Sequence, residues 1–188
     1  MKRLMTCVTV LLSIFCMEGV SAQVSQNTQK ETREQKKMEQ EQLDQLYFEE
    51  AKQAVESKDF ILEADQVIFK WGTSAFVSSN TNFVAVKGDE AVVQVAFNVP
   101  FSGYNGLGGV TVTGQVSDYK QKEDKNGNLY VTMNVMGTGI SAMVSINLPK
   151  GTNRASVDIS PNFNSNRFTL RGTLLPAGKA NVFKGWSL

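Results

Sequence analysis

Residues 110–135 read VTVTGQVSDYKQKEDKNGNLYVTMNV, and this stretch decides the fold class. Its first eight residues alternate valine or glycine with polar side chains, a period of two that is typical of a β-strand with one buried face. Asn126 and Gly127 favour the positive φ angles of a two-residue hairpin turn. The returning strand places apolar side chains on one face at positions 129, 131, 133 and 135. The stretch therefore predicts an antiparallel hairpin.

The same alternation recurs on both sides of this hairpin. Residues 60–69 are rich in β-forming types, and residues 83–85 and 93–97 flank the tight-turn sequence Lys87-Gly88-Asp89-Glu90. Further alternating runs lie at residues 142–148, 155–159 and 168–174. About eight strands joined mostly by short turns predict an antiparallel meander, closed into a β-sandwich or a small β-barrel. No helical pattern lies between the strands, which argues against a parallel α/β sheet.

The N-terminus has the features of a secretory signal. Lys2 and Arg3 precede the mostly apolar residues 4–16, and Val20-Ser21-Ala22 supplies small residues for cleavage. We therefore expect a signal peptide over residues 1–22 and an exported protein, periplasmic or secreted. The competing interpretation is a lipoprotein that is acylated on Cys16. Such a cysteine normally follows a small residue, and the bulky Phe15 therefore disfavours acylation.

Residues 23–58 form a charged, partly helical segment that precedes an antiparallel β domain over residues 59–188. The segment is rich in Gln, Glu and Lys and has neither Gly nor Pro up to Ser57. Apolar residues share one helical stripe only in its second half, at positions 43, 46, 47, 51, 54 and 55. That half is expected to dock, either on its own domain or on a partner.

The cysteines and histidines restrict the possible chemistry. Cys7 and Cys16 both lie in the predicted signal, and the chain has no histidine. Histidine- or cysteine-based catalytic sites and ordinary zinc sites are thereby excluded, and we expect no cofactor and no metal. Nineteen basic residues balance eighteen acidic ones. Nucleic-acid binding requires a basic face, and this charge balance gives no reason to expect one.

An outer-membrane barrel would show the same alternation, but its lipid-facing surface carries aromatic girdles at both interfaces. Most apolar positions here are Val, Ile, Leu, Ala or Met, and a charged segment comes first. We therefore do not expect an integral membrane protein.

Two loops could contact a ligand. Residues 101–109 are rich in glycine, but a strand follows them rather than the helix of a phosphate-binding loop. Residues 161–167 are rich in asparagine, whose side chains often bond within their own turn. Ligand-binding candidates are Tyr104, Asn105 and Trp186. Residues 124–128 resemble the start of a calcium loop, but a strand replaces the remaining ligands.

Paired carboxylates are the catalytic arrangement that survives without histidine and cysteine, as in glycoside hydrolysis. Glu63 and Asp65 share a strand face, whereas Asp118 and Asp158 fall on outward positions of their strands. The sequence gives no sign that any of these carboxylates is buried. No catalytic residue is assigned.

Several blocks together resemble a known family. The blocks are residues 76–83, 103–112, 133–140, 161–167 and 182–188, and they are similar to the exported Bacteroidetes family called domain of unknown function 4251. The resemblance implies an exported, β-rich domain without an assigned activity. It carries no catalytic residue over to this chain.

Taken together, these features favour an exported cell-envelope protein that is a non-enzymatic binding or interaction module for a small ligand or an envelope partner. One alternative is a carboxylate-dependent hydrolase acting on glycans. Another is a structural envelope protein that is tethered through its N-terminal helix.

Overall fold

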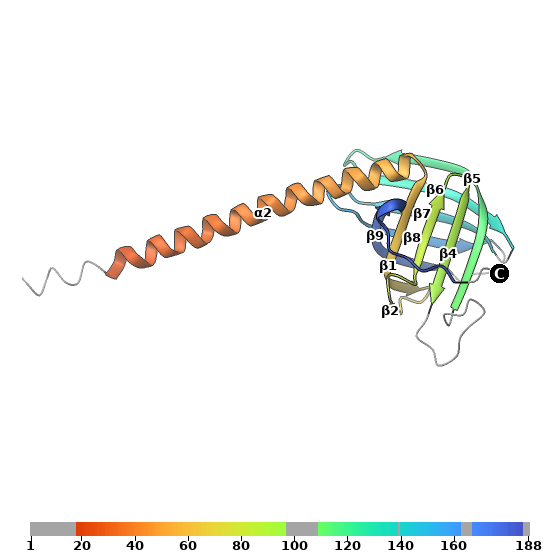
Figure 1. Ribbon diagram of the computed structural model, residues 1–188, viewed down its shortest axis with the longest axis horizontal. Coiled ribbons are helices and arrows are strands. Elements are labelled where there is room, and N and C mark those ends of the chain that lie inside the picture. The colour runs from red at the N-terminus through yellow and green to blue at the C-terminus, as the bar shows by residue number, and fades with distance from the viewer. Residues whose placement is uncertain (1–17, 97–108, 139, 163–166, 186–188) are drawn as a thin grey trace, which may run out of the picture. The chain divides into compact units, whose positions relative to one another are not determined.

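The computed structural model describes residues 18–96, 109–138, 140–162 and 167–185. One long helix precedes nine strands and a short 3₁₀ helix (Figure 1). The elements are α2 (Glu18–Glu56), β1 (Asp59–Phe69), β2 (Ser74–Phe76), β3 (Phe83–Lys87), β4 (Glu90–Ala96), β5 (Gly109–Glu123), β6 (Leu129–Gly137), β7 (Ile140–Leu148), β8 (Arg154–Pro161), β9 (Phe168–Pro176) and η1 (Ala177–Lys179).

Eight of the strands close into an antiparallel barrel. Their order is β1-β3-β4-β5-β6-β7-β8-β9, and β9 pairs again with β1 from Phe60↔Pro176 to Phe69↔Phe168. The short β2 is an additional strand beside the second half of β1. The predicted antiparallel meander of about eight strands is confirmed as a barrel, and the sandwich alternative is wrong. Alternation alone could not distinguish them, because both architectures bury the same face of every strand.

A bulge in β1 shapes the closing seam. The register between β1 and β9 shifts between Ala64 and Gln66, and Gly172 lies opposite Ala64. A Cβ atom on Gly172 would come within 1.9 Å of the backbone oxygen of Glu63. Only glycine therefore lets the two strands approach this closely, which is a common reason for glycine inside a strand.

Apolar side chains fill the barrel interior. The inward positions carry Val, Leu, Ile, Phe, Ala and Met, as expected when an eight-stranded barrel is filled by side chains. Members with no more than 2 % of their surface exposed include Phe60, Leu62, Val84, Val131, Met133, Val144, Ile146, Val157, Leu170 and Leu174. The interior is therefore a packed core.

The last turns of α2 cover one end of the barrel, which we call the helix end. Phe48, Ala51, Ala54 and Val55 are buried against the core. Nζ of Lys52 lies 2.7 Å from a carboxylate oxygen of Glu123 at the end of β5. The expected docking of the helix on its own domain is confirmed for residues 48–55.

The apolar stripe of the helix differs in part from the expected one. Leu43, Leu46 and Tyr47 remain exposed, and Phe48 takes their place in the core. Positions 48, 51 and 55 follow the three- and four-residue spacing of one helix face. A compact unit begins at Asp44, and residues 1–43 form a separate unit.

The predicted hairpins are present, with one difference in turn length. Gly88 and Asp89 join β3 to β4 as a two-residue turn, and Gly88 has a φ of 59°. The β5–β6 turn is not the expected two-residue turn, because Glu123 pairs with Leu129 and residues 124–128 lie between them. The carboxylate of Asp124 accepts hydrogen bonds from the backbone of Asn126 and Asn128 and organises this longer turn.

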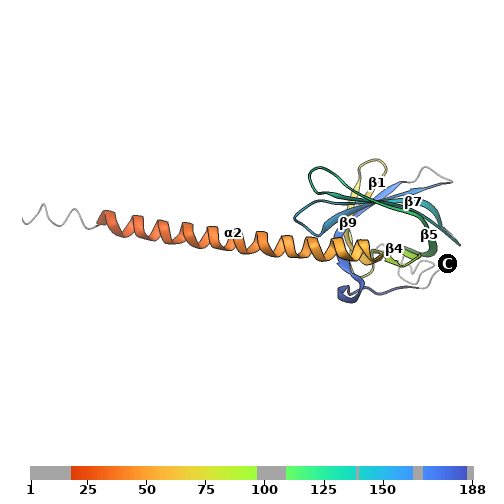
Figure 2. The ribbon, with the colours of Figure 1, turned by 90° about the horizontal axis from the view of Figure 1, so that it is seen from above.

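The C-terminal segment, residues 180–185, crosses the outer face of β1, β3 and β4 (Figures 1 and 2). It covers an outward-facing glutamine, Gln94, which has no exposed surface. Nε2 of Gln94 donates to the carbonyl oxygens of Thr81 and Phe183 at 2.9 and 2.8 Å. Its Oε1 accepts a 2.8 Å hydrogen bond from the Thr111 hydroxyl. Outward positions are buried here, so strand alternation does not reveal this cluster.

Within the described part of the chain, none of the helices combines the length and apolar character that a bilayer crossing requires.

Candidate functional site

A β-bulge interrupts β5 at mid-length. Ser117 pairs with Asn134 and Lys120 pairs with Thr132, so two residues of β5 stand opposite one residue of β6. Asp118, the first of the two, has a φ of 53°, which residues other than glycine rarely adopt. Bulges of this kind re-aim side chains and are frequent beside functional sites.

The bulge turns Tyr119 toward the helix end. Its ring packs against the core, and its hydroxyl donates a 2.7 Å hydrogen bond to the carbonyl oxygen of Val55, in the last turn of α2. Burial raises the pKa of the Tyr119 phenol to about 12. Nζ of Lys58 lies 5.1 Å from the ring centroid, within cation–π distance. Tyr119 therefore joins the bulge to the helix.

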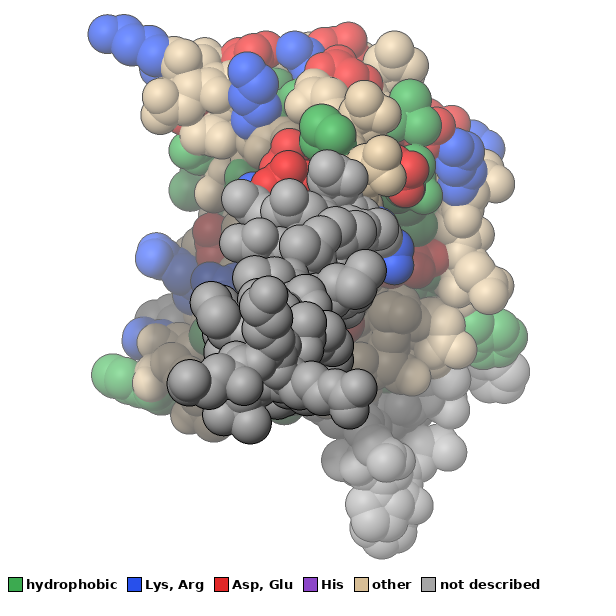
Figure 3. All heavy atoms as spheres, turned by 90° about the vertical axis from the view of Figure 1, so that its left-hand side faces the viewer, with side chains coloured by type: hydrophobic (Ala, Val, Ile, Leu, Met, Phe, Trp, Pro, Cys, Tyr) green, Lys and Arg blue, Asp and Glu red, His purple; other side chains and the backbone are tan. Residues whose placement is uncertain are grey.

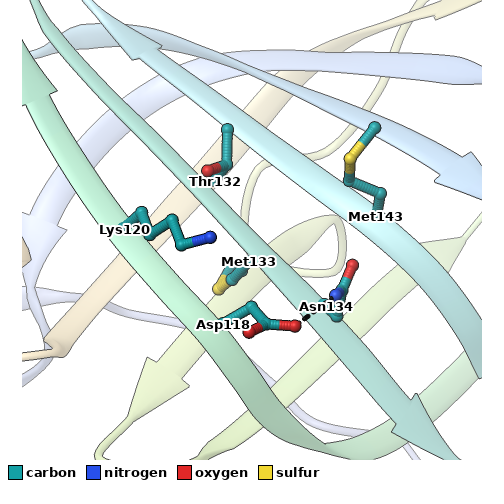
Figure 4. A pocket seen from close by; sticks show the side chains of 6 residues that line it. All are labelled: Asp118, Lys120, Thr132, Met133, Asn134 and Met143. Atoms are coloured by element: carbon teal, nitrogen blue, oxygen red, sulfur yellow. Dashed lines mark hydrogen bonds between the residues drawn. The ribbon is translucent and has the colours of Figure 1, made fainter.

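The same bulge opens a depression on the barrel surface, with a volume of about 200 Å³ (Figure 4). Nδ2 of Asn134 donates a 2.9 Å hydrogen bond to the carboxylate of Asp118. Met133, whose side chain belongs to the core, also lines the depression. We call this site the bulge depression; it is lined by Asp118, Lys120, Thr132, Met133, Asn134 and Met143.

The lining combines groups with complementary hydrogen-bonding roles. Asp118 supplies a carboxylate acceptor, and Lys120 supplies an ammonium donor of opposite charge. Thr132 and Asn134 can both donate and accept. Met143 is partly exposed and offers an apolar contact. A carboxylate and an ammonium together give no net charge, so the depression suits a small, neutral and polar molecule.

The predicted ligand-binding residues cannot be placed in this site. Tyr104, Asn105 and Trp186 lie outside the described residues, as do residues 101–108 and 163–166 of the two candidate loops. Their proposed role stays a prediction.

Glu63 and Asp65 each have a separate structural contact. The carboxylate of Glu63 accepts a 2.6 Å hydrogen bond from the backbone N–H of Asn181. Asp65 forms a two-pronged ion pair with the guanidinium of Arg154, which raises the pKa of that arginine. The two carboxylates therefore hold different segments of the chain in place.

The remaining acidic candidates are also explained locally. The carboxylate of Asp158 accepts a hydrogen bond from the Thr169 hydroxyl on β9. Hydrogen bonds from the side chain and backbone of Asn128, and from the backbone of the turn, lower the pKa of Asp124. Within the described ranges, no three Asp, Glu, His or Cys side chains are grouped so that they could hold a metal ion. Asp124 thus organises the β5–β6 turn.

The sequence model of a family described as domain of unknown function, DUF4251, matches residues 42–174. The chain belongs to the DUF4251 family. A solved structure of a DUF4251 family protein from Bacteroides eggerthii DSM 20697 shares 48% identity and a TM-score of 0.66. The alignment covers 76% of this chain and 96% of that one. No curated protein matches this DUF4251 chain.

The bulge depression was missed in the sequence, although a signal for it was present. In the DUF4251 chain, Val116 and Tyr119 both point inward, a spacing of three that breaks the period of two. Such a break is what one extra residue in a strand produces. Asp118 was correctly expected on the outward face, but its neighbours across β6 and β7 depend on the register. Strand register cannot be read from alternation alone.

Proposed function

We propose that this protein is an exported cell-envelope protein and a non-enzymatic binding module, with the bulge depression as its ligand site. Export is supported by the basic start, the apolar residues 4–16 and the small residues before position 23. Binding is supported by one observation above all: a non-glycine residue, Asp118, is held at positive φ beside a polar hollow. Strained backbone that persists in a fold is often associated with a functional site.

The geometry favours a ligand on the outside of the barrel rather than inside it. The interior positions are occupied by core side chains, so the packed core supports no internal binding site. On the outside, Asp118 and Asn134 are already oriented by their mutual hydrogen bond. Pre-oriented groups lose less conformational freedom when a ligand arrives, which favours binding.

The proposed ligand class is a small neutral polyhydroxylated compound, such as a sugar residue of a glycan. Its hydroxyl groups could donate to Asp118 and accept from Lys120 and Asn134. The thioether of Met143 would contact the apolar C–H face of a sugar ring. A volume of about 200 Å³ gives room for one sugar ring in the depression itself.

The hydrolase alternative has weaker support. Glu63 and Asp65 are occupied by contacts with the Asn181 backbone and with Arg154. Hydrolysis of a glycosidic bond by the usual route needs two carboxyl groups that flank the bond. In the bulge depression Asp118 is the single carboxylate among the described lining residues.

The tether alternative is supported by a different observation. The side chains of residues 33–43 are exposed, and residues 1–43 form a unit distinct from the barrel. A solvated helix of this kind suits a spacer or an attachment to another envelope protein. Deletion of residues 23–43 would then abolish co-purification of that partner and leave barrel unfolding unchanged.

The binding proposal can be tested by titrating neutral mono- and disaccharides into isotope-labelled protein and following the amide resonances. We expect at least one sugar to shift the resonances of Asp118, Lys120 and Asn134. Lys120→Met should weaken that binding about tenfold, since it removes a charged hydrogen-bond donor. Lys122→Met, on the same outward face of β5, is the matched control and should have no effect. At a sugar concentration of about 10 mM, even a site with a Kd of about 1 mM would be largely occupied. If no sugar shifts these resonances at that concentration, the proposal fails.

A further inference from the structure

The end of the barrel opposite the helix end carries an aromatic hairpin. Strands β1 and β2 pair through Gln66↔Phe76 and Ile68↔Ser74, and residues 70–73 form the turn between them. Trp71 in this turn is 86% exposed, and Phe76 is 87% exposed. We call this end the hairpin end. Two large aromatic side chains left almost wholly in water on one short hairpin are unusual for a folded domain, because burying them releases free energy.

The loops at the hairpin end share one sign of charge. Their described residues are 70–73, 77–82, 138, 162 and 167, and residues 183–185 of the C-terminal segment lie beside the loop 77–82. These described residues include three basic side chains, Lys70, Arg167 and Lys184, and neither Asp nor Glu. Among the coloured side chains of Figure 3, the lower edge, where this end lies, shows no acidic group.

The helix end differs in composition. Glu50, Asp89, Glu123 and Asp124 lie there beside lysines, and several of these carboxylates form ion pairs with them. The difference matters because it gives the molecule two chemically distinct ends: one mixed in charge, the other basic and aromatic. The basic end should attract a negatively charged partner.

The C-terminal segment adds a third exposed aromatic side chain and a third cation to the hairpin end. Phe183 is 62% exposed, and Lys184 follows it. The backbone of Phe183 donates a 2.8 Å hydrogen bond to the carbonyl oxygen of Asn80 and accepts one from Gln94. Phe183 is thus presented to solvent from an anchored backbone.

We propose that the hairpin end docks on the surface of a lipid bilayer that contains anionic headgroups. Transfer of tryptophan and phenylalanine side chains from water to the boundary between headgroups and acyl chains is favourable. Lys70 stands next to Trp71, with Nζ 5.1 Å from its ring centroid, so its ammonium can meet a lipid phosphate while the indole enters the boundary. Charge complementarity selects an anionic surface over a neutral one.

A second copy of the chain is the competing occupant. Among the described residues β2 pairs on one side only, with β1, so its other edge could pair with another strand. Such pairing would bring two identical basic ends together, and their like charges would repel each other. The charge pattern therefore favours the lipid surface.

Vesicle binding tests the proposal directly. The chain without residues 1–22 should be used, because the apolar run in that segment would itself enter lipid; the compact unit from Asp44 remains whole. We expect binding to vesicles of phosphatidylcholine with phosphatidylglycerol, weaker binding to phosphatidylcholine alone, and loss of the difference at high salt. The tryptophan emission should shift to the blue on binding, and Trp71→Ser should remove most of that shift, since Trp186 is the other tryptophan of the chain.

Two pairs of variants locate the contact. Lys70→Glu should weaken binding roughly 25-fold, since each surface cation contributes about a fivefold factor and the variant changes the charge by two units. Lys125→Glu, in an exposed turn at the helix end, should change it by less than about twofold. Trp71→Ser should weaken binding roughly tenfold, whereas Tyr130→Ser, on the outer face of β6, should not.

Equal binding to both vesicle types would overturn the proposal, as would binding that Lys70→Glu and Trp71→Ser leave unchanged. If the protein binds neither vesicle and Trp71→Ser instead converts a dimer to a monomer, the hairpin end is an interface between copies. Sugar binding at the bulge depression is measured separately and does not depend on either result.

Discussion

The backbone N–H of Gly185 donates a 2.7 Å hydrogen bond to Oε1 of Gln94, although 91 residues separate them in the chain. Through this contact and its neighbours, one side chain ties the C-terminal segment to β4. Both donor hydrogens and both acceptor positions of the amide are used. Gln94 is buried, and its amide is the partner of the Phe183 carbonyl oxygen and of the Gly185 N–H.

Gln94→Leu should therefore destabilise the protein by about 2–4 kcal/mol. The leucine fills a similar volume but leaves the Phe183 carbonyl and the Gly185 N–H without their partner, and each buried polar group left unpaired costs about 1–3 kcal/mol. Urea unfolding measures the change. Gln115→Leu, at an exposed position of β5, is the control and should change stability by less than about 0.5 kcal/mol. Equal effects of the two substitutions would contradict the role of Gln94.

Gly172→Ala should be strongly destabilising. The added methyl group would meet the Glu63 carbonyl oxygen at 1.9 Å, and strand backbone on both sides prevents a simple shift. Overpacking of this kind costs about 1–3 kcal/mol or opens the seam between β1 and β9. Thermal unfolding provides the measurement.

Gly178→Ala is the control for this substitution, because nothing lies within 4 Å of its added methyl group. It should leave the unfolding temperature within a few degrees of the parent value. A Gly172→Ala variant as stable as Gly178→Ala would show that the seam is looser than the register implies.

Tyr119 predicts an alkaline limit to stability. Its folded-state pKa is about 12, above the value near 10 of an unfolded tyrosine. The folded state therefore holds its proton more tightly, so the stability from this group is fully present below about pH 10 and is lost as the pH rises through about 12. Tyrosinate absorbance should show one phenol that ionises last.

Tyr119→Phe removes the ionisable hydroxyl and keeps the packed ring, so it separates the contribution of ionisation from that of packing. The variant should lose about 1 kcal/mol at neutral pH with the hydrogen bond to Val55. Its unfolding free energy should also fall less steeply than the parent's between about pH 10 and 12, since one group with a shifted pKa is gone. Parallel pH profiles for the two proteins would contradict the burial of the phenol.

The parts of the fold that alternation governs were predictable, and the parts that depend on closure or register were not. Val131, Met133 and Val135 point inward as their spacing requires, and the Gly88-Asp89 turn connects two strands as expected. Closure of the barrel depends on β9 meeting β1, whose paired residues lie 99 to 116 positions apart in the chain, from Phe69↔Phe168 to Phe60↔Pro176. Local sequence patterns carry no information about such a contact.

The candidate sites show the same division. Lys120, Thr132 and Met143 occupy outward positions on three neighbouring strands, and only the register and the bulge bring them together. The burial of Gln94 has no sequence signal either, because it results from the C-terminal segment lying over it. A polar residue on an outward strand position is ordinarily expected to face water.

Asp118 gives the last prediction, which concerns the backbone of the bulge itself. At a φ of 53° a residue with a Cβ atom is strained, whereas glycine is not. Asp118→Gly and Asp118→Ala both remove the carboxylate and its hydrogen bond from Asn134. The alanine variant keeps the strain of about 1–2 kcal/mol, and the greater entropy of the unfolded glycine chain offsets about 0.4–1 kcal/mol of it. The alanine variant should therefore be about 0.5–1 kcal/mol less stable than the glycine variant in urea unfolding. Neither should bind the sugar that binds the parent protein, because both lack the acceptor. If the two variants unfold at the same urea concentration, Asp118 is not held at positive φ; if either binds the sugar as tightly as the parent, the carboxylate does not contact the ligand.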